Sequence, residues 1–198
     1  MERRPEGRYV RLFLLCAAAL LIGSAANAQS FDNFKSFCLA TDAQPDAVQS
    51  SVLSAGWTEV DSAMFGDAMS DGDRLMAVYV SPEDEAGIIM VGEGEPPLDL
   101  GGEVTAKWCV MATESVSVER ARSLLIVELG LGGPIAHEID DGLWLYSTTD
   151  GVIRDERALV GRSAADVRTA SLERPLRFTG AGGGPGPVML VHAQIQAR

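Results

Sequence analysis

The chain has 198 residues, of which 46% are hydrophobic and 22% are charged. This balance is typical of a globular protein and excludes a fibrous or wholly disordered chain, while the length predicts one domain or at most two small ones. The formal net charge of −12 repels nucleic-acid phosphates and anionic lipid, so we expect neither a nucleic-acid partner nor electrostatic docking on a membrane.

The first 28 residues have the three parts of a secretory signal peptide. Four arginines among the first eleven residues precede an apolar run over residues 12–25, and an Ala-Asn-Ala cleavage site ends at Ala28. The run has 14 residues, whereas a membrane-spanning helix needs about 20, and the alternative is an uncleaved anchor. We expect cleavage near Ala28, a periplasmic or secreted location, and a mature chain of net charge −14, without membrane contact after cleavage.

Two cysteines, Cys38 and Cys109, remain after this cleavage. In an oxidising compartment two cysteines most simply form one disulfide, which here closes a loop across 71 positions. The alternative is a reactive thiol or half of a metal site, but the Cys-x-x-Cys spacing that supports it is absent. We therefore predict a disulfide between Cys38 and Cys109.

In the first half of the chain the patterns predict two helices and then strands. Phe31, Phe34 and Phe37 lie at helical spacing, and a second helix begins at Pro45 and stops at Gly56. Residues 61–73 are mixed and rich in turn formers. Apolar or alternating patterns then predict strands over 75–80, 87–91 and 103–113, with a loop over 92–102.

In the second half, capping and turn residues give the clearest signals. Ser117 and Gly130 delimit a helix, and Asp150-Gly151 marks a tight hairpin. The remaining segments are a helix over 163–172, strands over 176–179 and 187–196, and a flexible glycine-rich loop over 180–186. Because neighbouring strands mostly form hairpins, we expect an α+β fold: an antiparallel sheet with helices packed on one face, as a single domain over 29–198.

Motifs that carry chemistry are incomplete in this sequence. His137 begins a zinc-protease-like motif, but Asp141 stands where the second histidine belongs. An acidic segment around Asp71 resembles a calcium loop without its final bidentate carboxylate, and the glycine-rich segment lacks the helix and lysine of a phosphate loop. We therefore predict no catalytic residue, no metal site and no cofactor, although His192 or His137 remains a candidate base.

Two aromatic residues form the predicted contact site. Trp144 and Tyr146 share one face of a strand, and Leu143 and Leu145 lie on the other. If the leucines face the core, the aromatic side chains form an exposed patch that can bind a partner.

Part of the pattern resembles a group of small exported bacterial proteins of unknown function that carry a two-cysteine α+β domain. The shared features are Phe34-x-x-Phe37-Cys38, Gly56-Trp57, Cys109 within a strand, and a helix that ends at Gly130. The resemblance supports export and the disulfide, and it implies no catalytic residue.

We expect an exported, non-catalytic module that binds an envelope protein or a small ligand. The alternatives are an envelope hydrolase that uses His192 or His137 as its base, and an inhibitor or structural component of the envelope.

Overall fold

The computed structural model describes residues 29–68, 73–82, 87–96, 100, 104–135, 142–183 and 186–198. The predicted signal peptide over residues 1–28, Asp71 and His137 lie outside the described residues.

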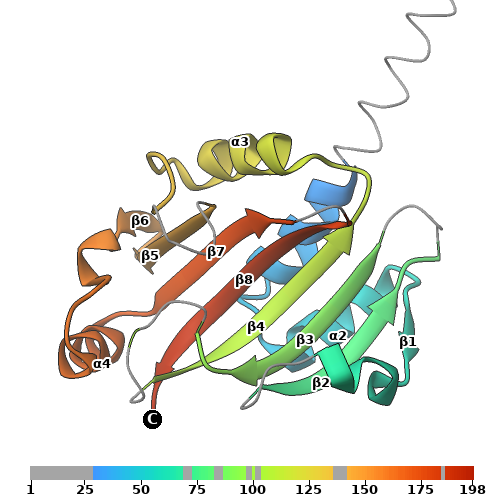
Figure 1. Cartoon of the computed structure of the whole chain (residues 1–198), viewed down its shortest axis with the longest axis horizontal. Helices are drawn as coiled ribbons and strands as arrows, with labels where there is room; N and C mark the ends of the chain where they lie inside the picture. The colour runs from blue at the N-terminus through green and yellow to red at the C-terminus, as the bar shows by residue number, and fades with distance from the viewer. Residues whose placement is uncertain are drawn as a thin grey trace, which may run out of the picture.

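Within the described residues, eight strands form one antiparallel sheet in the order β1-β2-β3-β4-β8-β7-β5-β6 (Figure 1). The strands are β1 Thr58–Val60, β2 Arg74–Val80, β3 Ile88–Gly94, β4 Val104–Thr113, β5 Leu143–Thr149, β6 Val152–Asp155, β7 Leu176–Gly182 and β8 Val188–Ala197. The antiparallel pairing and the helices that flank it confirm the predicted α+β fold, but the helices do not all pack on one face as expected.

The helices lie on the two faces of this sheet. They are a helical segment over 29–34, the π-helix η1 Lys35–Leu39, α2 Pro45–Ser54, the 3₁₀ helix η2 Ser62–Ala68, α3 Val118–Leu129, the 3₁₀ helix η3 Arg157–Leu159 and α4 Ala164–Glu173. Buried residues of η1, α2 and α3 share one core cluster with the sheet, whereas Val167 and Ala170 of α4 belong to a second cluster, because α4 covers the face opposite to η1, α2 and α3. Figure 1 shows the blue N-terminal helices and α2 behind the central strands. None of the helices in the described part of the chain is long and apolar enough to cross a membrane.

The predicted helix boundaries are confirmed because their capping chemistry is local. Pro45 is the first residue of α2, and Gly56 follows its end with φ +84°. The Ser117 hydroxyl accepts a hydrogen bond from the backbone N–H of Arg120 at 3.2 Å, and Gly130 ends α3 in the left-handed conformation.

The disulfide prediction is confirmed. Cys38 in η1 and Cys109 in β4 are bonded, both are fully buried, and their Cα atoms lie 5.4 Å apart. Nearby, the Phe37 and Trp57 rings pack edge to face at 5.4 Å. The bond therefore ties the N-terminal helical segment to a central strand of the sheet.

Two predictions about strands are wrong. The glycine-rich loop does not begin at Gly180, because β7 continues to Gly182. A Cβ at Gly180 would lie 2.4 Å from Leu143 Cδ2 and 2.9 Å from the Gly142 carbonyl oxygen, so glycine allows β5 to approach. In addition, β3 continues to Gly94 within the predicted loop, and the sequence patterns missed the short edge strand β1.

Candidate functional site

The face of the sheet that packs against η1, α2 and α3 carries a row of polar residues. Residues directly opposite one another in antiparallel strands point to the same face. The register places Lys107, Gln194, Arg177 and Tyr146 in one such row across β4, β8, β7 and β5. His192 lies two residues before Gln194 on β8 and therefore faces the same side.

The turn between η1 and α2 brings Asp42 over this row. Asp42 and the following Ala43 both have left-handed backbone conformations, with φ of 54° and 53°. Aspartate tolerates this conformation better than most residues. The disulfide holds the chain to the sheet only four residues earlier, at Cys38, so the turn starts from a fixed point.

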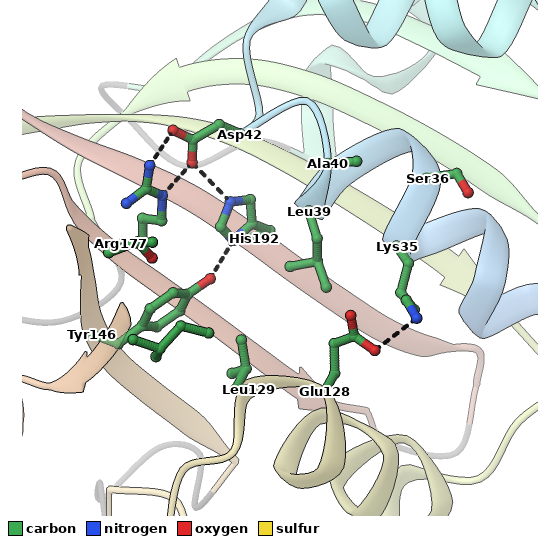
Figure 2. Close-up of a pocket in the computed structure, with 12 residues that line it drawn as sticks. Lys35, Ser36, Leu39, Ala40, Asp42, Glu128, Leu129, Tyr146, Arg177 and His192 are labelled. Carbon is green, nitrogen blue, oxygen red and sulfur yellow. Dashed lines mark hydrogen bonds and ion pairs between the residues drawn. The ribbon is translucent and has the colours of Figure 1, made fainter. Parts of the chain in front are cut away.

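The Asp42 carboxylate contacts side chains of β7 and β8, and Tyr146 of β5 joins the cluster through His192 (Figure 2). Arg177 donates two parallel hydrogen bonds to it, from Nε to Oδ1 at 2.5 Å and from Nη2 to Oδ2 at 2.7 Å. His192 Nε2 lies 3.3 Å from Oδ1, and the Tyr146 hydroxyl lies 3.5 Å from His192 Nδ1. Bidentate pairing of arginine with a carboxylate is among the stronger polar interactions in proteins, so this pair fixes the turn.

The electrostatics of the cluster follow from burial and pairing. Burial raises the pKa of the Asp42 carboxyl, but the hydrogen bonds from His192 and Arg177 outweigh it and lower the pKa to about 2. Burial also dominates at His192, which is 1% exposed, and lowers the pKa of its imidazole despite the contact with Asp42. The hydrogen bond to the backbone of Phe178 also favours the charged ring but does not outweigh burial, so we assign a neutral imidazole whose Nε2 lies against Asp42 and whose Nδ1 lies against the Tyr146 hydroxyl.

A cavity of about 510 Å³ opens beside this cluster. One end is polar and is formed by Asp42, Arg177, His192 and Tyr146. The walls are apolar, with Leu39 from η1, Leu129 from α3 and Ile153 from β6. Figure 2 shows Leu39 and Leu129 on opposite sides of the space next to Tyr146.

The rim of the cavity carries an ion pair between helices that are far apart in sequence. Lys35 Nζ of η1 lies 2.7 Å from Glu128 Oε2 of α3, and about one third of each side chain is exposed. The hydrogen bond to Glu128 raises the pKa of Lys35. Both residues belong to the cavity lining, and both charges stay partly exposed to solvent.

The predicted exposed patch of Trp144 and Tyr146 is wrong, because the two side chains are only 1% and 3% exposed. Leu143 and Leu145 face the second core cluster, as expected, but the aromatic face is covered as well. The Trp144 indole donates to the carbonyl of Gly132 at 2.9 Å, in the segment that follows α3. Tyr146 nevertheless lines the cavity, so one of the two predicted contact residues lies in the candidate site.

Sequence reasoning identified His192 only as a candidate base and did not find Asp42 or Arg177. Arg177 and His192 lie 135 and 150 positions after Asp42 in the chain. No local spacing in the sequence therefore connects the three residues. Among the described residues, no group of three or more His, Cys, Asp and Glu side chains is arranged to hold a metal ion.

Comparisons with protein-family models, with curated proteins and with solved structures find no match to this chain. The function is therefore inferred from the residues of the cavity and their geometry.

Proposed function

We propose that the chain is an exported binding module that takes a small ligand into the cavity between η1, α3 and the strands β5 to β8. The observation that carries this proposal is a cavity of about 510 Å³ with apolar walls and one polar end. Ligand sites of small molecules have this size and composition, with a few positioned polar groups that orient the ligand.

Export is supported by two features that are independent of the cavity. The N-terminal sequence has the arginines, apolar run and Ala-Asn-Ala site of a secretory leader. The Cys38–Cys109 disulfide suits an oxidising compartment.

The engagement of His192 favours binding over the alternative of a hydrolase. A general base needs a ring nitrogen within hydrogen-bond reach of its substrate. Here Asp42 occupies Nε2, the Tyr146 hydroxyl lies against Nδ1, and the imidazole is 1% exposed. The Asp42–His192–Tyr146 contacts therefore support a role in holding the shape and polarity of the cavity.

Two neighbouring threonines of β5 provide the test. Thr148 lines the cavity, whereas Thr149 is exposed on the opposite side of the strand. Thr148→Trp should fill the cavity, and Thr149→Trp adds the same bulk outside it. A fragment library is screened against the purified protein by ligand-detected NMR, and each hit is titrated against both variants.

We expect hits whose affinity falls at least about tenfold in Thr148→Trp and stays unchanged in Thr149→Trp. Ser36→Trp, at an exposed position of the same cavity lining, gives a second blocked variant if Thr148→Trp is unstable. Hits that bind both blocked variants as tightly as the wild type, or the absence of any hit, would contradict the proposal.

A further inference from the structure

We infer that the cavity selects an uncharged amphipathic molecule, with a hydroxyl or carbonyl head and an apolar body. This inference rests on the proposed function, and it specifies the chemical class of the ligand.

The charged groups that line the cavity neutralise one another in pairs. Arg177 is held by the Asp42 carboxylate through two hydrogen bonds of 2.5 and 2.7 Å at the polar end. At the rim, Lys35 is paired with Glu128 at 2.7 Å. Two cations and two anions thus face the space, and each has its partner within the same cavity lining.

A charged ligand would lose hydration here without gaining a free counter-ion. Moving a charge out of water is costly unless it meets an opposite charge or enough hydrogen bonds. Competing for Asp42 or Arg177 would break a pair in which the side chains are only 25% and 16% exposed. An uncharged head avoids this cost.

Neutral hydrogen-bonding groups and apolar walls complete the match. Tyr146 lines the cavity, and its hydroxyl is a neutral group that can hydrogen-bond to a ligand oxygen. Thr148, another uncharged polar residue, also belongs to the lining. Leu39, Leu129 and Ile153 offer an apolar surface to the body of the ligand.

Three probes with the same eight-carbon chain test the selectivity. The purified protein is titrated at neutral pH with 1-octanol, octanoate and octylammonium, and binding is measured by ligand-detected NMR. We expect 1-octanol to bind at least about tenfold more tightly than either ion. This binding should be lost in Thr148→Trp and kept in Thr149→Trp.

Two substitutions at the rim test whether pairing of charges sets this preference. Glu128→Gln removes the carboxylate that contacts Lys35 at the rim and leaves the weaker attraction of Asp32, which is not part of the cavity lining, so octanoate should gain about three- to tenfold in affinity. Lys35→Gln leaves Glu128 unpaired at the same place, so octylammonium should gain by a similar factor. Both positions are about one third exposed, and both proteins should remain folded.

The outcomes separate the ligand class from the proposed function. Tight octanoate or octylammonium binding that Thr148→Trp abolishes would overturn the uncharged class and leave the cavity as a ligand site. Failure of all three probes would also overturn this class, while the fragment screen decides on the function independently. If neither rim substitution raises the affinity for octanoate or octylammonium, charge pairing is not the cause of the preference for 1-octanol.

Discussion

The substitution Asp42→Asn isolates the charge at the centre of the candidate site. Asparagine has nearly the same size as aspartate and also tolerates the left-handed backbone that residue 42 adopts, with φ 54°. The variant therefore removes the negative charge that Arg177 and His192 contact and leaves the turn free of new strain.

The expected magnitude follows from the pKa of Asp42, which falls from 3.8 to about 2 in the folded protein. A shift of this size corresponds to about 2.5 kcal/mol. Because the side chain is 25% exposed, screening by solvent reduces the expected contribution to about 1–2 kcal/mol. A carboxyl whose folded pKa is lowered stabilises the protein fully above its unfolded pKa, near 4, and this contribution disappears as the pH falls towards about 2.

The assay is urea unfolding of the wild type and Asp42→Asn at about pH 6 and near pH 2. We expect the variant to be about 1–2 kcal/mol less stable at the higher pH and nearly equal to the wild type at the lower pH. Asp150→Asn is the matched control, because Asp150 is also left-handed, with φ 52°, but is exposed in a hairpin turn. An equal loss at both pH values, or an equal loss in Asp150→Asn, would show that the charge of Asp42 does not stabilise the fold.

Three further predictions concern the stability of the fold, each measured by urea unfolding. Cys38→Ser removes the disulfide, which closes a loop of 71 positions, and should lower the free energy of unfolding by up to about 4 kcal/mol. Reductant should then change the stability of the wild type only. Equal stability with and without the bond would contradict this. Gly180→Ala should cost about 1–3 kcal/mol because its Cβ would lie 2.4 Å from Leu143 Cδ2, whereas Gly186→Ala, with open space around it, should cost less than about 1 kcal/mol. Arg174→Met should cost about 1–2 kcal/mol, since the Glu156 carboxylate loses both hydrogen bonds from Arg174 and keeps the one from Ser147. An unchanged unfolding midpoint would count against this ion pair.

The predictable parts of the fold are the helix ends and the tight turn, which are determined by residues close together in the chain. Pro45 begins a helix because it has no N–H to leave unpaired, and Ser117 caps one with its hydroxyl. The Asp150-Gly151 turn formed as predicted, with φ of 52° and 75°. Each of these signals acts within a few residues of the chain.

The wrong predictions depend on contacts between distant segments. The composition around Gly180 is that of a loop, yet Leu143 of the neighbouring strand occupies the place of a side chain. The alternation in β5 indicated which residues share a face, but it did not reveal that the segment after α3 covers Trp144.

The candidate site could not be predicted for the same reason. Asp42 lies in a turn, and Tyr146, Arg177 and His192 lie on three adjacent strands whose order is β5, β7, β8. Their meeting requires this strand order and the disulfide that holds η1 on β4. Neither the order of the strands nor the pairing of Asp42 with Arg177 has a signature in the local sequence.

The most direct measurement is a crystal structure of the protein grown with 1-octanol. We expect the alkyl chain to lie between Leu39 and Leu129 and its hydroxyl to be within hydrogen-bond distance of Tyr146. A molecule bound elsewhere on the protein, and not beside Asp42 and Arg177, would contradict the proposed ligand site.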